Sequence, residues 1–287
     1  MMKRRNQSVQ ILRNAAFGAA LAMLLPMDAS AQTATLPERV KATGTLTVGI
    51  EATYPPMAYK DPKTNERTGV NIHLVESIAK ELGVKVKWEE MSFEQLMTSL
   101  TTGRIDMIGT AISDLPSRRE KLTFVDYLVT GSQPFTTTAK KDTIKTEADL
   151  CGKTVGAPRT TNYFPVLQAW SEKNCVSAGK PAATVNGTAG ATATRLDLKQ
   201  GRLDAAVLGP EYVAYLMADE PNTYALAGEP LTRGLFGFAF NKNDTALRDA
   251  VATALTATIK SGAYKQALQK FGLERQAVTE VKIDAGT

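Results

Sequence analysis

The heptapeptide Leu100-Thr-Thr-Gly-Arg-Ile-Asp106 recurs in the second half of the chain as Leu198-Lys-Gln-Gly-Arg-Leu-Asp204. In both copies a run with helical spacing ends at a glycine, and Arg, an aliphatic residue and Asp lead into an apolar stretch. Because glycine commonly follows the last residue of a helix, each copy predicts a helix that passes into a buried strand. The recurrence indicates two lobes of similar α/β design.

Strand and helix patterns alternate on both sides of the two copies. Period-two or continuous apolar runs predict strands at 46–50, 84–88, 105–112, 153–157, 203–208 and 236–240. Helical spacing is found at 71–82, 93–100, 162–174, 196–200, 244–260 and 263–271. This order predicts parallel βαβ units with right-handed crossovers, and therefore an α/β fold of two Rossmann-like lobes with a ligand cleft between them. We expect lobe 1 to comprise 43–129 and 241–287, and lobe 2 to comprise 130–240.

One helix start carries a specific local signature. Ser92 is followed three residues later by Gln95, which is the spacing of a capping box. The inner face of this helix is expected to consist of Phe93, Leu96, Met97 and Leu100.

The N-terminus has the order of parts of a secretory signal peptide. Lys3-Arg-Arg5 forms a basic start, 15–27 is a short apolar run, and Ala29-Ser-Ala31 offers small residues for cleavage. A membrane anchor would need about 20 apolar residues, which is more than this run provides, and no later segment is apolar enough to span a bilayer. We expect residues 1–31 to be removed after Ala31 and the mature chain to reside in the periplasm.

The net charge of the chain is modest, and most of it lies in the N-terminal segment that is expected to be cleaved off. The formal net charge is +5, and three of these charges come from the signal segment, so the mature chain is near neutral. Such a chain has no electrostatic preference for nucleic acid or for membrane surfaces, and neither is expected as a partner.

Cys151 and Cys175 are the only cysteines, and an exported chain with two cysteines is expected to join them in a disulfide. The sole histidine, His73, is distant from both in the sequence. We therefore predict neither a zinc site nor a histidine-activated cysteine nucleophile. No metal, cofactor or catalytic residue is expected, and we interpret His73 as a structural residue at the surface or the hinge.

Candidate ligand-binding residues follow the first strand of the first lobe. In open α/β sheets a ligand lies beyond the carboxyl ends of the strands, and Glu51 and Tyr54 come directly after the strand that ends at Ile50. Tyr54 could cover a ligand as an aromatic wall, or it could simply pack in the rigid turn that Pro55-Pro56 forms.

Two further strand ends carry groups suited to an anion. Ala111, Ser113 and Arg118 follow a strand of the first half, and a guanidinium binds a carboxylate through two parallel hydrogen bonds. The alternative is an ordinary surface arginine. In the second half Thr160 and Thr161 lie between a strand and a helix, where backbone amides attract anions, although plain helix capping explains them equally well.

Several motifs, taken in their order and spacing, resemble one known family. The chain is similar to the periplasmic solute-binding proteins for polar amino acids, the type II two-lobed receptors of ABC importers, over about residues 44–273. The motifs are Gly44-Thr-Leu-Thr-Val-Gly49, Tyr54-Pro-Pro-Met57, Gly69-Val-Asn-Ile-His-Leu74, Ile112-Ser-Asp-Leu-Pro-Ser-Arg118, Phe124-Val-Asp-Tyr127, Leu150-Cys-Gly-Lys-Thr-Val-Gly156, Ser261-Gly-Ala-Tyr264 and Lys270-Phe-Gly-Leu273.

The resemblance implies a role for each candidate residue. Tyr54 would stack on or cover the ligand, and Glu51 would face the side-chain pocket. The charge of that pocket would depend on which of Glu51, Glu211 and Phe93 line it. Ala111 would offer backbone groups, and Ser113 and Arg118 would hold the α-carboxylate. Either Thr160 or Thr161 would reach the same carboxylate from the other lobe. A monomeric binding protein that docks on the permease subunits of an ABC importer is implied.

One departure from the family pattern affects the expected ligand. The second-lobe strand of the family usually ends in an aspartate that takes the α-ammonium group, and here that position is Gly209. A buried ammonium without a carboxylate is costly. Either Glu211 or Glu51 supplies the charge, or the ligand has no α-ammonium group. His73 also stands where the family often has aspartate.

Two other functions are compatible with such a fold. The first is an enzyme related to the periplasmic cyclohexadienyl dehydratases, whose substrates include one without an α-amino group. Gly209, in place of the aspartate that takes an ammonium, is compatible with such a substrate. Against it, the chain lacks an obvious acid–base pair and the Gly-Gly-Thr-Asn-Glu stretch of those enzymes after Pro158. The second is a sensory domain that acts by docking on a partner. Neither alternative accounts for as many motifs as an importer receptor does.

Overall fold

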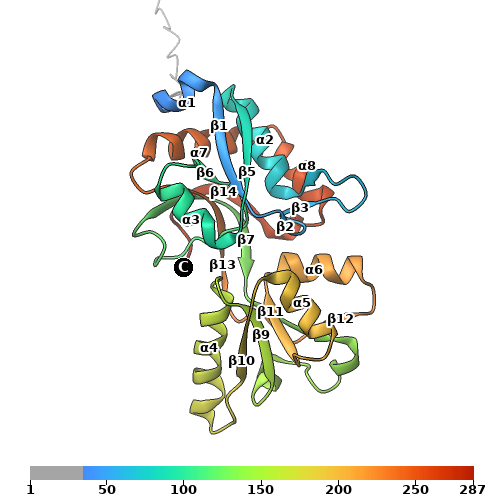
Figure 1. Ribbon diagram of the computed structural model, residues 1–287. Helices are drawn as coiled ribbons and strands as arrows, with labels where there is room; N and C mark the ends of the chain where they lie inside the picture. The colour runs from blue at the N-terminus through green and yellow to red at the C-terminus, as the bar shows by residue number, and fades with distance from the viewer. Residues whose placement is uncertain (1–34) are drawn as a thin grey trace, which may run out of the picture. The chain divides into compact units, whose positions relative to one another are not determined.

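The computed structural model describes residues 35–287, and two β-sheets, each flanked by helices, organise this part of the chain (Figure 1). The expected signal peptide and its cleavage after Ala31 lie outside these residues. Three clusters of buried side chains form among these residues, two against the first sheet and one around the second. The expected α/β fold of two lobes is confirmed. Among the described residues, no helix combines the length and the hydrophobicity that crossing a bilayer requires.

The first sheet has six strands in the order β14-β7-β13-β6-β1-β5. β1 runs parallel to β5 and β6, whereas β13 and β14 run antiparallel to their neighbours. Its strands are β1 (Thr45–Ile50), β5 (Lys85–Glu90), β6 (Met107–Ile108), β7 (Leu122–Gly131), β13 (Arg233–Asn241) and β14 (Ala277–Ile283). The accompanying helices are α1 (Glu38–Thr43), α2 (Val70–Leu82), α3 (Phe93–Thr101), α7 (Thr245–Lys260) and α8 (Ala263–Lys270). A small sheet of β2 (Thr53–Tyr54), β3 (Ala58–Lys60) and β4 (Arg67–Thr68) follows β1.

The second sheet has five strands in the order β10-β9-β11-β8-β12. They are β8 (Gln133–Thr137), β9 (Thr154–Pro158), β10 (Thr184–Thr188), β11 (Ala205–Leu208) and β12 (Tyr224–Leu226). β9 runs parallel to both of its neighbours, as a βαβ arrangement requires. The helices are α4 (Tyr163–Asn174), α5 (Ala191–Lys199) and α6 (Pro210–Asp219). Short 3-10 turns are found at η1 (Thr138–Lys140), η2 (Glu147–Leu150), η3 (Val176–Ala178) and η4 (Glu274–Gln276).

Two strands of the first sheet connect it to the second. β7 leads through Ser132 into β8, and β13 returns from the second sheet to pair with β7 from Arg233 opposite Gly131 onward. The expected boundary after Phe240 would assign most of β13 to the second lobe, whereas its pairing places it in the first sheet. The division into lobes remains a proposal, and the pairing favours crossing points near Gly131 and Arg233.

The repeated heptapeptide performs the same structural task in each sheet. Gly103 and Gly201 end their helices with φ angles of 73° and 74°, a left-handed conformation that suits glycine. The carboxylate of Asp106 accepts a hydrogen bond from the N–H of Thr47 at 2.8 Å. That of Asp204 accepts one from the N–H of Thr154 at 2.9 Å. Each aspartate therefore ties its own strand to the start of the neighbouring parallel strand.

Local sequence signals in the first lobe are largely confirmed. Ser92 and Gln95 form the expected capping box at the start of α3, and Gly83 ends α2 in a left-handed conformation. The expected strand at 105–112 is too long, because only Met107–Ile108 pairs as a strand and the following residues turn away to border a cavity. Met97 is 40 % exposed rather than part of the inner face of α3, where Ser99 is buried instead.

The predicted disulfide is present and links the segment before β9 to the end of α4. Cys151 and Cys175 are bonded across a sequence separation of 24 residues. In the chain-entropy description, such a cross-link stabilises a fold by about 3 kcal/mol, because it restricts the unfolded chain.

We expect the double substitution Cys151→Ser and Cys175→Ser to lower the free energy of unfolding by about 3 kcal/mol. Urea denaturation of the variant and of the wild type checks this value. Dithiothreitol should reproduce the loss in the wild type and leave the variant unchanged. Equal midpoints for the oxidised wild type and the variant would contradict the prediction.

Candidate functional site

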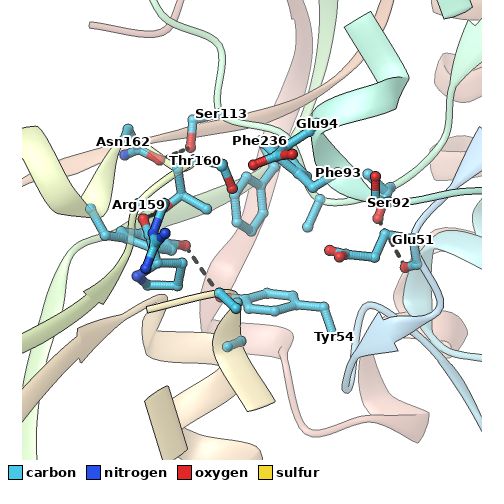
Figure 2. A pocket seen from close by; sticks show the side chains of 18 residues that line it. Glu51, Tyr54, Ser92, Phe93, Glu94, Ser113, Arg159, Thr160, Asn162 and Phe236 are labelled. Carbon is cyan, nitrogen blue, oxygen red and sulfur yellow. Dashed lines mark hydrogen bonds between the residues drawn. The ribbon is translucent and has the colours of Figure 1, made fainter. Parts of the chain in front are cut away.

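A cavity of about 300 Å³ lies where the carboxyl ends of β1 and β6 face the loop that follows β9. Figure 2 shows Glu51 and Ser92 on one side of it and Arg159 and Asn162 on the other, with Tyr54 along one edge. Both halves of the fold contribute to its wall, so the cavity is an interlobe site. The lining residues are Glu51, Tyr54, Ser92, Phe93, Glu94, Thr110, Ala111, Ser113, Pro158, Arg159, Thr160, Thr161, Asn162, Tyr163, Ala189, Gly190, Ala191 and Phe236.

Glu51 places a carboxylate on the first-lobe side of the cavity. It follows β1 directly and accepts hydrogen bonds from the backbone N–H of Phe93 and the hydroxyl of Thr53. Burial raises the pKa of this carboxyl, and the two hydrogen bonds act in the opposite direction. Because Phe93 is the first residue of α3, the helix N-terminus favours the ionised form of Glu51.

Arg118 lies behind the wall formed by Ser113 and Phe93. Its Nη1 donates a hydrogen bond to the carbonyl oxygen of Ser113 at 2.7 Å, and its guanidinium lies 5.8 Å from the centre of the Phe93 ring. Burial lowers the pKa of Arg118 to about 10, so the group remains charged at neutral pH. Among residues 35–287 it forms no salt bridge with a carboxylate. A half-buried cation with spare donors beside the cavity is suited to an anion.

The loop between β9 and α4 distinguishes the two threonine candidates. The hydroxyl of Thr161 donates to the carbonyl oxygen of Pro158 at 2.9 Å, so it is engaged within its own turn. Thr160 also lines the cavity, and its hydroxyl has no hydrogen-bond partner among the described residues (Figure 2). The adjacent Asn162 accepts a hydrogen bond from the hydroxyl of Ser113 at 3.2 Å. This last contact joins the two sides of the cavity.

Tyr54 contacts several residues of the second lobe. Its hydroxyl donates to Oε1 of Glu211 at 2.9 Å, lies 3.2 Å from the hydroxyl of Tyr163, and accepts a hydrogen bond from the N–H of Gly209 at 3.2 Å. Its ring stacks on Tyr212 with a centroid separation of 4.7 Å. Tyr54 is therefore both a wall of the cavity and a bridge to α6.

Glu211 is completely buried at the second position of α6. Oε2 accepts a hydrogen bond from the hydroxyl of Thr130 on β7 at 2.9 Å, and the carboxyl also receives the N–H of its own residue. Burial raises the pKa of Glu211 to about 7, although these hydrogen bonds favour the charged form. The group is therefore poised to change protonation near neutral pH.

The glycine at position 209 is explained by this carboxyl group. A Cβ atom at Gly209 would lie 1.7 Å from Oε1 of Glu211 and 2.7 Å from the hydroxyl of Tyr54. A side chain at this position would have to displace the carboxyl group of Glu211. The carboxyl oxygen of residue 211 thus occupies the space in which the side chain of residue 209 would begin.

The cavity unites seven of the nine ligand-binding candidates. Arg118 and Glu211 are absent from its wall and contact the lining residues from behind. Sequence reasoning did not identify Asn162, Tyr163 or Phe236. Asn162 and Tyr163 adjoin the Thr160-Thr161 candidates, so closer attention to that helix start could have found them. Phe236 carries no local signal of its own.

The remaining chemistry of the site is sparse. Glu51 and Glu94 are the acidic residues in its wall, and the exposed Arg159 donates to the carbonyl oxygen of Gly187 at 2.6 Å. The described residues contain no cluster of histidine, cysteine and acidic side chains arranged to hold a metal ion. His73 lies away from the cavity, where its ring is 3.0 Å from Nζ of Lys270 and packs near Phe271. The arrangement is suited to holding a small charged molecule.

Two α/β lobes with a cavity between them are the architecture of the two-lobed solute-binding proteins. The chain belongs to the bacterial extracellular solute-binding proteins, family 3, whose sequence signature matches residues 46–274. This confirms the family resemblance. The expectation that the protein binds its ligand without converting it agrees with relatives that are named as binding proteins.

Curated relatives match most of the chain. The L-cystine-binding protein TcyJ of Escherichia coli K12 is 29% identical over 81% of this chain and 84% of its own length. The arginine-binding protein ArgT of Corynebacterium glutamicum is 29% identical over 88% of this chain and 82% of its own length. The probable amino-acid-binding protein YxeM of Bacillus subtilis is 30% identical over 79% of this chain and 83% of its own.

Solved structures support the fold assignment. A mutant of the arginine-binding protein ArgBP from T. maritima superposes with a TM-score of 0.70 at 28% identity, covering 82% of this chain and 97% of that one. An ancestral amino-acid-binding protein described as a precursor of cyclohexadienyl dehydratase gives 0.68 at 27% identity, covering 81% and 97%. These likenesses show a type II two-lobed fold.

Proposed function

We propose that this protein is the periplasmic substrate-binding component of an ABC importer and that its ligand is an amino acid or a close derivative. The observation that carries this proposal is the set of polar groups from both lobes around one small cavity, with the unpaired guanidinium of Arg118 beside Ser113. A cavity of about 300 Å³ suits a molecule of this size. The naming of its relatives as cystine-, arginine- and amino-acid-binding proteins supports the same ligand class.

The charged and polar groups around the cavity indicate where the carboxylate of the ligand would bind. Arg118 and the hydroxyl of Ser113 would hold a carboxylate from the first lobe, and the free hydroxyl of Thr160 would reach it from the second. The backbone of Ala111 would add polar contacts, and Tyr54 and Phe93 would pack against the apolar part of the ligand. Thr161 has a lesser role in this proposal, because its hydroxyl is bonded within its own turn.

The ammonium group of an amino acid would be received by Glu211. Its carboxyl occupies the space where a side chain at Gly209 would begin, and the hydroxyl of Tyr54 separates it from the cavity. A ligand ammonium would displace or join that hydroxyl. Glu51 would face the ligand side chain, where a carboxylate favours a cationic or hydrogen-bonding group.

Binding is coupled to hinge closure in this proposal. A ligand that contacts Ser113 in one lobe and Thr160 in the other stabilises the arrangement in which both are within reach. β7 and β13 would act as the hinge because they connect the two sheets. Export with cleavage after Ala31 and docking on permease subunits as a monomer complete the proposed role.

One observation favours a second candidate, a receptor for a carboxylate that lacks the α-ammonium group. Glu211 is buried, already has hydrogen-bond partners at both oxygens, and has a pKa that burial raises to about 7. A neutral Glu211 would not require a cation. The similarity to a precursor of cyclohexadienyl dehydratase makes prephenate a sensible member of any ligand panel.

The proposal predicts that a common amino acid stabilises residues 32–287 against heat. The purified chain is unfolded and refolded to remove carried-over ligand, then screened with the twenty amino acids, cystine and prephenate. A specific ligand at about 100 times its Kd should add about 2.7 kcal/mol and raise Tm by about 5–10 °C. A shift confined to deaminated acids would support the second candidate, and turnover of prephenate would contradict a purely binding function.

A further inference from the structure

The segment after η4 lies beyond the part of the chain that the family signature covers. The signature ends at residue 274, whereas the chain continues through β14 to residues 284–286. β14 pairs with the outer edge of β7, opposite Asp126 and Val125 near its end. The contacts of residues 284–286 therefore lie outside the residues that the signature matches.

Asp284 fastens the end of β14 to β7. Its carboxylate accepts hydrogen bonds from the N–H of Phe124 and from the hydroxyl of Thr123, both at 2.8 Å. Its own N–H donates to the carbonyl oxygen of Phe124 at 3.2 Å. Three hydrogen bonds at one residue fix the direction in which the following backbone leaves the sheet.

The next two residues bind to a pair of buried aspartates. The N–H of Ala285 donates to Asp126 at 3.0 Å, and the N–H of Gly286 donates to Asp114 at 2.7 Å. Both aspartates are essentially inaccessible to solvent. A Cβ atom at Gly286 would lie 2.2 Å from the carbonyl oxygen of Asp114, so the two backbones are in close contact.

Arg119 closes this arrangement from the other side. Its Nε and Nη2 donate to the two oxygens of Asp114 at 2.7 and 2.6 Å, and Nη2 also donates to the carbonyl oxygen of Gly286. Asp114 thus receives donors from its own loop and from residue 286 at once. The carbonyl group of Gly286 also supplies an acceptor to Arg119.

The loop held in this way carries the proposed carboxylate-binding groups. Asp114 directly follows Ser113, and its N–H donates to the carbonyl oxygen of Leu235 at 2.9 Å. Arg118 directly precedes Arg119 and donates back to the carbonyl oxygen of Ser113. A displacement of Asp114 or Arg119 would therefore move both members of the carboxylate clamp.

We propose that residues 284–286, acting through Asp114, Asp126 and Arg119, form a strap that positions Ser113 and Arg118 for the carboxylate of the ligand. The identity of the ligand in this proposal rests on the proposed function. The contacts by which the strap holds the loop are independent of it. Because it also contacts β7, which leads to the second sheet, it joins the binding loop to one of the two crossing strands. The residues of the strap are positioning residues and do not contact the ligand.

The electrostatics of the aspartate pair agree with such a role. Burial and the nearby Asp114 together raise the pKa of Asp126 to about 7, although the N–H of Ala285 and the charge of Arg119 act in the opposite direction. Two buried carboxylates side by side repel each other when both are ionised. The donors of the strap and the guanidinium of Arg119 offset that repulsion.

Hydrogen–deuterium exchange on the ligand-free protein tests the strap directly. Two variants are compared with the wild type, a chain that ends at Ile283 and the milder Gly286→Ala. Lys282→Ala serves as the matched control, because Lys282 lies on β14 in an exposed pair with Glu280. Amides of residues 113–119 should exchange about tenfold faster in both strap variants and at the wild-type rate in the control. Unchanged exchange in a folded strap variant would overturn the proposal.

Ligand affinity supplies the second measurement. For an amino acid that binds the wild type, the strap variants should weaken binding about tenfold, whereas binding of the corresponding carboxamide should change by less than about twofold. Equal losses for both ligands would indicate general destabilisation and would contradict positioning of the clamp. If the loop exchanges faster but no amino acid binds even the wild type, the strap is supported and the proposed function fails.

Discussion

Replacing Arg118 with alanine is expected to weaken binding of the amino-acid ligand by about 100- to 1,000-fold, since a desolvated carboxylate loses its charged partner. The guanidinium of Arg118 is half-buried, remains ionised at neutral pH, and has no carboxylate partner among residues 35–287. Its hydrogen bond to the carbonyl oxygen of Ser113 aims it toward the loop that borders the cavity. Isothermal titration calorimetry of the variant measures the loss.

Two further arginine variants make this prediction specific. Arg118→Lys keeps the charge but loses the bidentate geometry, so its affinity should lie between those of the wild type and the alanine variant. Arg159→Ala removes an exposed arginine from the same cavity and should weaken binding by less than about tenfold, because an exposed charge contributes little. A severe loss in Arg159→Ala combined with a mild one in Arg118→Ala would place the carboxylate on the second lobe instead.

The second large effect is expected at Glu211. The substitution Glu211→Gln keeps the shape and most hydrogen bonds of the side chain but removes the charge that would receive an ammonium group. Loss of the carboxylate partner of a buried ammonium should weaken binding by about 100-fold or more. The same variant should bind a deaminated analogue as well as the wild type does, and calorimetry with both ligands makes the comparison.

The pH dependence of binding follows from the same carboxyl group. With a pKa of about 7 in the free protein, Glu211 must release its proton before it can pair with an ammonium group. Affinity for an amino acid should therefore rise about tenfold between pH 6 and pH 8, and this slope should vanish in Glu211→Gln. A wild-type affinity that stays constant over this range would contradict the assignment of Glu211.

The stability of the free protein should change in the opposite direction. Because the pKa of Glu211 is higher in the folded state than its ordinary value of 4.5, the folded state binds more protons between these two values. Its contribution to stability is therefore greatest below about pH 4.5 and declines as the pH rises toward 7. Opposite trends in stability and in affinity separate a specific role of Glu211 in binding from a general effect of pH.

Local patterns predicted much of the fold. The capping box at Ser92 and the helix ends at Gly103 and Gly201 depend on neighbouring residues only, and these predictions were confirmed. The long strand β7 was not predicted, because nine of its ten residues are buried and no alternation of polar and apolar residues marks it. A continuous buried run cannot be distinguished from a helix by periodicity alone. The edge strand β14 was likewise not predicted.

The sequence predicted the site residues that directly follow strand ends. It did not predict the relations that depend on contacts between residues far apart in the chain. Glu51 and Ser113 could be found because the ends of parallel strands converge on a ligand cleft. The relation between Gly209 and Glu211 could not, since it depends on how a side chain folds back over its own helix start and meets Tyr54, 157 residues away in the sequence. The difference between Thr160 and Thr161 similarly depends on the conformation of one turn.

Calorimetric titration of the refolded chain of residues 32–287 is the most direct test of an amino-acid ligand held by both Arg118 and Glu211. Three matched ligands are used: an amino acid that stabilises the protein, its deaminated acid and its carboxamide. We expect tight binding of the amino acid and losses of about 100-fold or more for each of the other two ligands, because each lacks one of the two paired charges. Equally tight binding of the deaminated acid would contradict the role of Glu211 in receiving the ammonium group. It would mean that Glu211 binds Tyr54 and not the ligand.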